Sequence, residues 1–429
     1  MLAPGAPVPS SPPDALPDRP HLPLWKVLVL GAMVVTLSMG IRHGFGLWLQ
    51  PITMDRGWSR ETFSIALALQ NLVWGLTGPA VGWWADKRGA YRVLLWGAAL
   101  YAVGLGGMAS SQSTLAFCLS TGAIIGCAQA CTTYAVIYGV IGRHARPDQR
   151  SSAMGITAAA GSFGQFLMVP VSSTLITQLG WQNALWCLAC AALLIVPLAR
   201  GLRQDRPLSH PTAASGATAS SLLEPASAGA ALREAIRHPS YLLLTGGYFV
   251  CGFQLAFIGV HLPSYLRDHQ LPPHVATTAL ALIGLFNVFG TYGVGWLGQR
   301  FSKPFLLAGI YSLRALAMLA FISTPPTGLT VGLFAATMGV LWLSTVPPTN
   351  AIVAQMLGVR HLSMLGALVF LSHQVGSFLG VWLAGRLYDA TGSYQVVWWG
   401  AIGLSLLAAA LNLPVREHEA PRSRLAVAT

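Results

Sequence analysis

The chain has 429 residues, of which 54% are hydrophobic and only 9% are charged, and its formal net charge is +12. Soluble domains carry about 25% charged residues, so this composition excludes an ordinary soluble protein and favours a membrane protein. A basic net charge can indicate nucleic-acid binding, but the positive-inside rule of membrane proteins explains it better. We therefore expect the lipid bilayer to surround this chain, and no nucleic-acid partner.

The first segment, residues 1–23, is rich in proline and serine and lacks the basic start and short apolar core of a secretory signal. We expect it to be a disordered cytoplasmic tail. A first bundle over residues 24–200 follows, because each of its apolar runs of about 20 residues can cross a bilayer as a helix. Its expected spans are Lys26–Gln50, Thr62–Ala85, Val93–Ser110, Leu115–Gly142, Ala153–Leu179 and Ala184–Leu198.

Residues 201–240 are rich in alanine, serine, glycine and proline, and we expect them to form a cytoplasmic linker. A second bundle over 241–415 and a cytoplasmic tail over 416–429 follow. The sequence therefore predicts an all-α membrane protein with twelve transmembrane helices. All six cysteines fall inside these helices, so we expect neither disulfides nor a metal site. The spans of the second bundle are Tyr241–Leu266, Val275–Leu297, Pro304–Ser323, Thr330–Leu357, Met364–Tyr388 and Val396–Leu413.

One pattern occurs twice, 212 residues apart. Gly40 and Pro51 are separated by eleven residues, and Gly252 and Pro263 repeat that spacing. A Gly-Trp turn follows each copy, at Gly82 in the first half and at Gly295 in the second. Such a duplication indicates a secondary transporter, in which the substrate path lies between two pseudo-symmetric bundles of six helices.

Basic residues gather in the loops on one side of the predicted membrane. By the positive-inside rule this side is the cytoplasm, and both termini lie there. Because the loops are compact, we expect a multi-pass protein of a bacterial inner membrane. The basic residues of this side are Lys87, Arg88, Arg92, Arg143, Arg146, Arg150, Arg200, Arg203, Arg206, Arg233, Arg237, Arg300, Lys303 and Arg360, and the other side keeps only Arg56, Arg60, Arg267 and Arg386.

The first Gly-Trp turn lies within a longer motif. Gly82, Asp86, Lys87, Gly89 and Arg92 fit G-x-x-x-D-[RK]-x-G-x-x-[RK], which resembles the loop between helices 2 and 3 of the major facilitator superfamily. The resemblance covers nearly the whole chain and implies the major facilitator fold and transport by alternating access. We expect a monomer.

These loop residues, together with Arg300 of the second copy, are expected to form the inward gate. Glycine permits close approach of neighbouring helices, and Asp86 can sit at a helix N-terminus or pair with a nearby arginine. The second copy of the turn keeps Gly295, Arg300 and Lys303 but has Gln299 in place of the aspartate.

The segment Gly57–Ser64, GWSRETFS, resembles bacterial monocarboxylate porters and their relatives that exchange oxalate and formate. This resemblance implies a small monocarboxylate as the substrate class. The binding residues of that group are not kept, since its helix-1 lysine position is Leu47 and its helix-8 aspartate and arginine positions are Asn287 and Thr291. The resemblance therefore gives a substrate class and no inherited site.

Two arginines fall inside predicted spans, whereas no acidic residue lies near the middle of one. A central arginine costs about 2.5–3.5 kcal/mol to insert, so each needs a partner or a water-lined cavity. Positive charge without negative charge favours an anionic substrate. We expect Arg42 to contact substrate, to bind helix-end carbonyls or to snorkel outward. Arg314 either contacts substrate or binds carbonyls of helices 8 or 12 as a structural residue.

Polar side chains complete the predicted substrate site. Arg42 aligns with Gln254 in the repeat, so both are expected on the cavity-lining faces of helices 1 and 7. Tyr134 and Tyr138 are four residues apart and share one face of helix 4. The alternative for such side chains is interhelical hydrogen bonding alone. The remaining candidates are Asn287, His373 and Asn350, the last of these beside a double proline.

Histidine is the natural proton carrier if transport is proton-coupled, because no carboxylate lies inside the predicted spans. The candidates are His373, His261 and His43, of which His261 lies near the outer end of its helix, where it can simply be hydrated. Each can instead be a hydrogen-bonded structural residue. Uniport or anion exchange needs no such carrier.

The sequence thus predicts a transporter that moves a small organic anion, and more narrowly a monocarboxylate, across the membrane. The alternative is efflux of a neutral or hydrophobic small molecule, with Arg314 purely structural. The sequence has no phosphate-binding loop, metal-ligand spacing or Ser/His/Asp set, so we expect neither enzymatic activity nor a cofactor.

Overall fold

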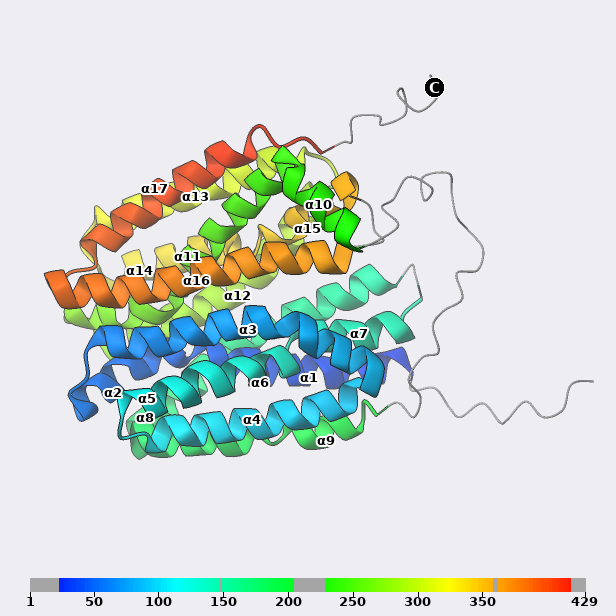
Figure 1. Ribbon diagram of the computed structural model, residues 1–429. Helices are drawn as coiled ribbons and strands as arrows, with labels where there is room; N and C mark the ends of the chain where they lie inside the picture. The colour runs from blue at the N-terminus through cyan, green and yellow to red at the C-terminus, as the bar shows by residue number, and fades with distance from the viewer. Residues whose placement is uncertain (1–22, 147–148, 204–227, 358–361, 418–429) are drawn as a thin grey trace, which may run out of the picture.

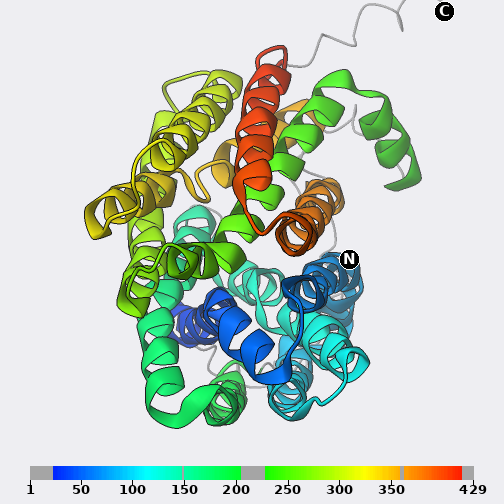
Figure 2. The ribbon, with the colours of Figure 1, turned by 90° about the vertical axis from the view of Figure 1, so that its left-hand side faces the viewer.

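The structure, a computed structural model, describes residues 23–146, 149–203, 228–357 and 362–417. These residues fold into helices that form two bundles side by side, drawn blue to teal and green to red in Figure 1. Seen from one end, the first bundle lies below the second (Figure 2). The all-helical architecture confirms the predicted fold class.

The first half contains α1 to α9. Its first span is α1, extended by the short helices η1 and α2, and its fourth span is built from α5, the π-helical turn η2, α6 and α7. The bounds are α1 (Leu24–His43), η1 (Phe45–Trp48), α2 (Leu49–Arg56), α3 (Arg60–Arg88), α4 (Ala90–Ser110), α5 (Thr114–Phe117), η2 (Cys118–Ile124), α6 (Ile125–Thr132), α7 (Tyr134–His144), α8 (Arg150–Ala192) and α9 (Ile195–Arg200).

The second half contains α10 to α17. Helix α10 lies in the segment expected to be a linker and was not predicted; it packs against α11 and α16 through the buried Ala235. The bounds are α10 (Ala228–Arg237), α11 (Pro239–Asp268), α12 (Pro273–Leu297), α13 (Lys303–Ile322), α14 (Gly328–Leu341), α15 (Val346–Leu357), α16 (Leu362–Thr391) and α17 (Gln395–Asn412).

We name the two ends of the molecule after residues that lie there. The Arg60 end is the end at which α2 ends, α3 begins, and α11 and α16 end. At the Leu24 end, α1 begins, and α3 and α15 end.

Eleven helical segments among the described residues are long and apolar enough to cross a membrane, and one of them crosses twice. Helix α8 contains Gly180 with φ 79° and ψ 161°, a left-handed conformation that suits glycine. Next to it, the Trp181 carbonyl accepts a hydrogen bond from Trp48 at the Arg60 end, whereas Gly201 touches Leu30 near the Leu24 end. The chain therefore reverses at Gly180 without a loop, and the described residues make the twelve predicted crossings.

Each half is held together by one close pair of parallel helices. In the first half, α1 lies against α8 where Gly40 and Gly164 face the other helix; in the second, α11 lies against α16 at Gly252 and Gly376. The offset between the two glycine pairs is again 212 residues. Small residues allow such close packing in membranes, where dispersion contacts replace the hydrophobic effect. The sequence repeat is thus a repeat of helix packing.

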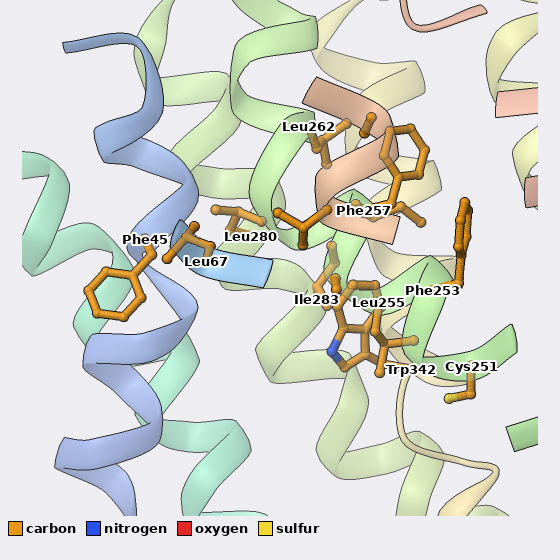
Figure 3. Close-up of a cluster of buried hydrophobic side chains, with 14 of the residues drawn as sticks. Phe45, Leu67, Cys251, Phe253, Leu255, Phe257, Leu262, Leu280, Ile283 and Trp342 are labelled. Atoms are coloured by element: carbon orange, nitrogen blue, oxygen red, sulfur yellow. The ribbon is translucent and has the colours of Figure 1, made fainter. Parts of the chain in front are cut away.

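The two halves meet along α3 with α16 and along α8 with α12. At the Arg60 end, one apolar cluster contains side chains of both halves, among them Phe45, Leu67, Leu280 and Ile283 (Figure 3). The buried residues of a second cluster, toward the Leu24 end, belong only to the first half. The shared core therefore lies at the Arg60 end.

The glycines on the facing helices show where this contact ends. A Cβ atom at Gly75 of α3 would meet Gln374 of α16, and one at Gly284 of α12 would meet α8. Further toward the Leu24 end, on the same helix faces, a Cβ atom at Gly82 of α3 or Gly295 of α12 would meet nothing within 4 Å. The halves thus touch from the Arg60 end to mid-membrane and separate toward the Leu24 end.

The chain after α17 returns to the start of α13. The Glu417 carboxylate accepts hydrogen bonds from the Ser302 hydroxyl (2.7 Å), the Lys303 backbone N–H and the Lys303 ammonium (3.1 Å). A carboxylate at a helix N-terminus is stabilised by the helix dipole. Burial alone would raise the pKa of Glu417, but these hydrogen bonds outweigh burial and hold the pKa below its usual range.

We predict that Gly376→Leu destabilises the protein by about 1–3 kcal/mol, because the new side chain would overlap the α11 backbone at Phe249 and Phe253. The matched control is Gly293→Leu, which enters open space. The melting temperature of purified protein should fall for the first variant only. Equal melting temperatures would contradict the proposed packing of α11 on α16.

We predict that Glu417→Gln lowers stability at pH 7 by about 1 kcal/mol, the scale of a charge-assisted contact near the surface. A carboxylate whose pKa is depressed on folding stabilises above its unfolded pKa of about 4.3 and loses that effect as pH falls through the folded value. The difference from wild type should therefore shrink below about pH 4. Asp55→Asn, at an exposed carboxylate, is the control; a difference independent of pH would refute this role of Glu417.

Candidate functional site

Both halves contain a broken helix at equivalent positions. In the first half, Thr133 has φ −108° and ψ −163°, which separates α6 from α7. In the second half, α14 ends at Leu341 and α15 begins at Val346, so that Thr345, 212 residues after Thr133, lies in the break. Paired breaks near the midplane are typical of transporter binding sites, because they free backbone groups where polar groups are otherwise absent.

In the second half, Arg314 satisfies the break. Its Nη2 donates to the carbonyls of Leu341 (2.6 Å) and Trp342 (2.5 Å), its Nε donates to Leu341 (3.2 Å), and its Nη1 donates to Gln254 (3.3 Å). The side chain is 0% exposed. These contacts match the structural alternative, although the carbonyls belong to the broken tenth span and not to helices 8 or 12 as expected.

Asn287 serves the same break from α12. Its Oδ1 accepts from the Leu343 backbone N–H (2.9 Å), and its Nδ2 donates to Ser162 of α8 in the other half (2.7 Å). Gln254 is also fully buried and donates to the Ala401 carbonyl (2.9 Å). The expectation that Gln254 mirrors Arg42 on a cavity face is therefore not met, because its amide belongs to the core of the second half.

In the first half, threonine hydroxyls satisfy the carbonyls of the break. Thr132 donates to Ala128 (2.8 Å) and Thr133 donates to Gln129 (2.7 Å). The Thr133 side chain does not cap α7. Since the first N–H groups of a helix lack partners within it, the start of α7 presents positive backbone dipoles, and anions bind well at such ends.

Arg42 lies near this break, at the end of α1. Its Nη2 donates to Asn71 Oδ1 of α3 at 2.6 Å, and its guanidinium lies 4.8 Å from the ring centroid of Trp74. Among the described residues its Nε has no hydrogen-bond partner, although that atom is buried. Ser38, one turn before Arg42 on α1, hydrogen-bonds with Thr132, two residues before the start of α7 (2.7 Å). Arg42 therefore keeps one donor available where α7 begins.

A chain of hydrogen bonds continues from Arg42 into the second half. Gln374 of α16 donates from Nε2 to the Asn71 backbone carbonyl (3.0 Å), and its Oε1 lies 3.0 Å from His373 Nδ1. Because an amide oxygen only accepts, His373 Nδ1 carries the proton. The His373 ring stacks on Phe370, which in turn contacts Trp74 edge-on. The chain thus links the Arg42 surroundings to α16.

Tyr134 and Tyr138 share a face, as predicted, with ring centroids 5.5 Å apart, and both are half-buried. His43 is half-buried at the end of α1, and Asn350 is exposed on α15. His261 is 0% exposed, so the expectation of a hydrated residue is wrong; its ring nitrogens lie 3.0 Å from Tyr394 Oη and from the Val381 carbonyl.

The predicted gate loop is very short: Gly89 alone separates α3 from α4, with φ 87°. The expected close approach at Gly82 is absent in this conformation, since nothing lies within 4 Å of a Cβ atom placed there. Lys87 lies over Trp83 and Arg300 over Trp296, while Arg92 is exposed. The Asp86 side chain lies outside the described part of the structure.

Sequence analysis missed several residues that connect the halves. Asn71, Trp74 and Gln374 surround Arg42, and Arg60 and Asp268 join the halves at the Arg60 end. The only signal in the sequence for these residues is that they are polar or aromatic side chains inside or beside predicted spans. Their pairing depends on helix packing, which a single sequence does not specify.

Two pseudo-symmetric bundles, each with a broken helix at the equivalent position, are typical of a secondary transporter. A sequence model of the Major Facilitator Superfamily matches residues 28–362. The chain belongs to the Major Facilitator Superfamily, which confirms the resemblance found in the sequence and excludes an enzyme as its class.

Curated relatives include an uncharacterized MFS-type transporter, YcxA, of Bacillus subtilis, which is 23% identical over 386 residues and is matched over 87% of this chain and 90% of its own length. Monocarboxylate transporter 13 of Rattus norvegicus is 25% identical over 86% of this chain and 83% of its own length. The oxalate:formate antiporter of Oxalobacter formigenes is 21% identical, with 69% and 68% covered.

Among solved structures, a bacterial homolog to the human lysosomal transporter Spinster, in an inward-facing and unoccupied conformation, superposes with a TM-score of 0.74. It is 17% identical and covers 93% of this chain and 99% of its own. This likeness shows the fold.

We predict that Arg314→Met lowers the free energy of unfolding by about 3–5 kcal/mol, because it leaves buried carbonyls without donors. Arg42→Met should cost about 1.5–3 kcal/mol, since Arg42 has one hydrogen bond, to Asn71. Thermal unfolding of both purified variants tests this difference. Equal stability of the two variants would show that Arg314 does not hold the break.

Proposed function

We propose that the protein transports a small organic anion, and more narrowly a monocarboxylate, by alternating access of a site at Arg42 between the two halves. The observation that carries this proposal is the buried Arg42 Nε without a partner, beside the start of α7. A carboxylate can accept from Nε and Nη2 of one guanidinium at once, which gives a short and directional contact.

The polar and aromatic groups around Arg42 fit the rest of such a ligand. Tyr134 and Tyr138 are half-buried beside α7 and can donate hydrogen bonds without adding charge. Trp74 and His373 close the site toward α3 and α16. The similarity to monocarboxylate and oxalate:formate transporters supports the same substrate class.

The Leu24 end is proposed to face the cytoplasm of a bacterial inner membrane, with both termini on that side. The described basic residues of its loops and helix ends support this orientation. The described conformation, open toward the Leu24 end, would then be the inward-facing one, and Asp86 and its loop would close this end. The residues are Lys87, Arg88, Arg92, Arg146, Arg200, Arg203, Arg237, Arg300 and Lys303.

A second candidate is efflux of a neutral or hydrophobic compound. Arg314 donates its hydrogen bonds to backbone carbonyls, so only one of the two expected arginines is left to contact an anion. This observation favours the alternative. The two proposals differ in whether Arg42 binds the ligand.

We predict that Arg42→Gln abolishes stabilisation of the purified protein by monocarboxylates, because a hydrogen bond to a charged group contributes about 1.5–3 kcal/mol, which is about tenfold or more in affinity. Arg42→Lys should retain a weaker response, since lysine keeps the charge but loses the two-atom contact. The measurement is the ligand-dependent shift in melting temperature with a panel of carboxylates, neutral compounds and lipophilic cations.

The control for this experiment is Arg56→Gln, which changes an arginine that lies over Trp181 at the Arg60 end, away from the site. It should leave the ligand response unchanged. A full carboxylate response in Arg42→Gln, or a response restricted to neutral or hydrophobic compounds in wild type, would rule out the anion proposal.

A further inference from the structure

A dense polar cluster joins the two halves at the Arg60 end, away from Arg42. We call it the Arg60 cluster; it consists of Arg60 and Ser64 of α3 together with His261, Asp268, Asp389 and Tyr394 of the second half. Arg60 forms a two-point pair with Asp268, at 2.6 Å and 2.7 Å, and its Nη1 also donates to Tyr394 Oη at 2.9 Å. Its guanidinium lies 3.7 Å from the Tyr388 ring centroid.

The second contact across the halves is a helix cap. The Asp389 carboxylate of α16 accepts from the backbone N–H groups of Arg60 (3.1 Å) and Glu61 (2.7 Å), the first two residues of α3. Such a cap stabilises the start of α3 only while α16 lies against it. Separation of the halves at this end therefore exposes these two N–H groups to solvent.

His261 ends the hydrogen-bond chain that starts at Arg60. The Val381 carbonyl only accepts, so His261 Nε2 donates to it at 3.0 Å, and Nδ1 is left unprotonated to accept from the Tyr394 hydroxyl at 3.0 Å. That hydroxyl accepts from Arg60 in turn. Ser64 lies 3.3 Å from Nε2 and donates to the Arg60 carbonyl. The closed arrangement thus requires a neutral histidine.

The charges around this chain are balanced. Arg60 of α3 pairs with Asp268, whereas Arg267 of α11 donates to Gln50 of α2, whose amide in turn donates to Asp268. Beyond them, Asp389 caps α3, and Glu61 accepts from Trp382 and lies 3.5 Å from Arg386. A proton on His261 adds one positive charge to this set and removes the acceptor that the Tyr394 hydroxyl uses. Both effects oppose the closed form.

We propose that the Arg60 cluster is the gate of the Arg60 end and that protonation of His261 opens it. The opened form lets His261 meet water, so it binds the proton more tightly than the closed form and its population rises as pH falls. This inference shares one premise with the proposed function: the protein alternates between a form open at the Arg60 end and a form open at the Leu24 end. If the Arg60 end faces the exterior, an acidic exterior admits anions from that side.

Hydrogen exchange tests this gate without any substrate. Purified wild-type protein in lipid nanodiscs is compared at pH 7.5 and pH 5.5 by following the peptide that contains Arg60 and Glu61, with rates corrected for intrinsic exchange. We expect protection of this peptide to fall about tenfold at the lower pH, the equivalent of one charge-linked hydrogen bond. Unchanged protection at the lower pH would overturn the proposal.

Variants separate the roles within the cluster. His261→Gln keeps a donor and an acceptor but cannot be protonated, so its peptide should stay protected at both pH values. Asp268→Asn should lose protection about tenfold at both pH values, because it removes one partner of the ion pair. If Asp268→Asn does not fold, Tyr394→Phe, which keeps all charges, should reduce the pH response by breaking the chain from Arg60 to His261.

The matched control is His269→Gln, at an exposed histidine that follows α11 at the same end and whose ring lies against Tyr265 and 2.8 Å from the Tyr265 carbonyl. It should keep the wild-type pH response. A response lost in His269→Gln, or kept in His261→Gln, would refute the role of His261. Since the assay needs no ligand, failure of carboxylate binding at Arg42 leaves this result intact, and the reverse also holds.

Discussion

Inside a bilayer every backbone N–H and C=O group must find a partner within the protein, and this constraint governs both broken helices. At the break in the second half, an arginine provides the missing donors for two carbonyls. At the break in the first half, threonine hydroxyls do so without charge. The same requirement thus has two chemical solutions at positions that the repeat makes equivalent.

This difference gives the pseudo-symmetric halves unequal roles. Because Arg314 is fully buried and donates to the carbonyls of its own half, its guanidinium is not exposed at the break of the second half. The first half keeps the amide end of α7 and the partly occupied guanidinium of Arg42. Under the proposed function, an anion would be attracted mostly by the first bundle, and the second bundle would contribute Gln374 and His373 through the Asn71 contact.

The sequence predicted the fold well because its signals are strong and local. Apolar runs of bilayer length, the 212-residue repeat and the loop motif at Gly82 each report on the fold without knowledge of contacts between helices. The sequence also predicted two separate spans on either side of Gly180, where the structure reverses the chain without a loop inside α8.

The site was predicted only in part. Arg42, Tyr134 and Tyr138 could be chosen as candidates because charge and spacing inside a span are informative. Arg314 was open between two roles, and its partners depend on a break whose carbonyl directions no sequence pattern gives. Arg60 and Asp268 looked like ordinary loop charges, since their pairing over 208 residues arises from packing of the halves.

The hydrogen bond between Arg42 and Asn71 bears on how an empty carrier returns across the membrane. The neutral Asn71 amide oxygen accepts a hydrogen bond from the guanidinium at 2.6 Å, so the Arg42 charge has a polar partner within the protein even in a poorly polar medium. If the proposed function holds, an arriving carboxylate would have to replace the Asn71 oxygen, which would weaken its apparent affinity and speed its release. In this mechanism, Asn71 would occupy the position of the substrate on Arg42. A stronger Arg42–Asn71 hydrogen bond would lower substrate affinity and raise the rate of substrate release.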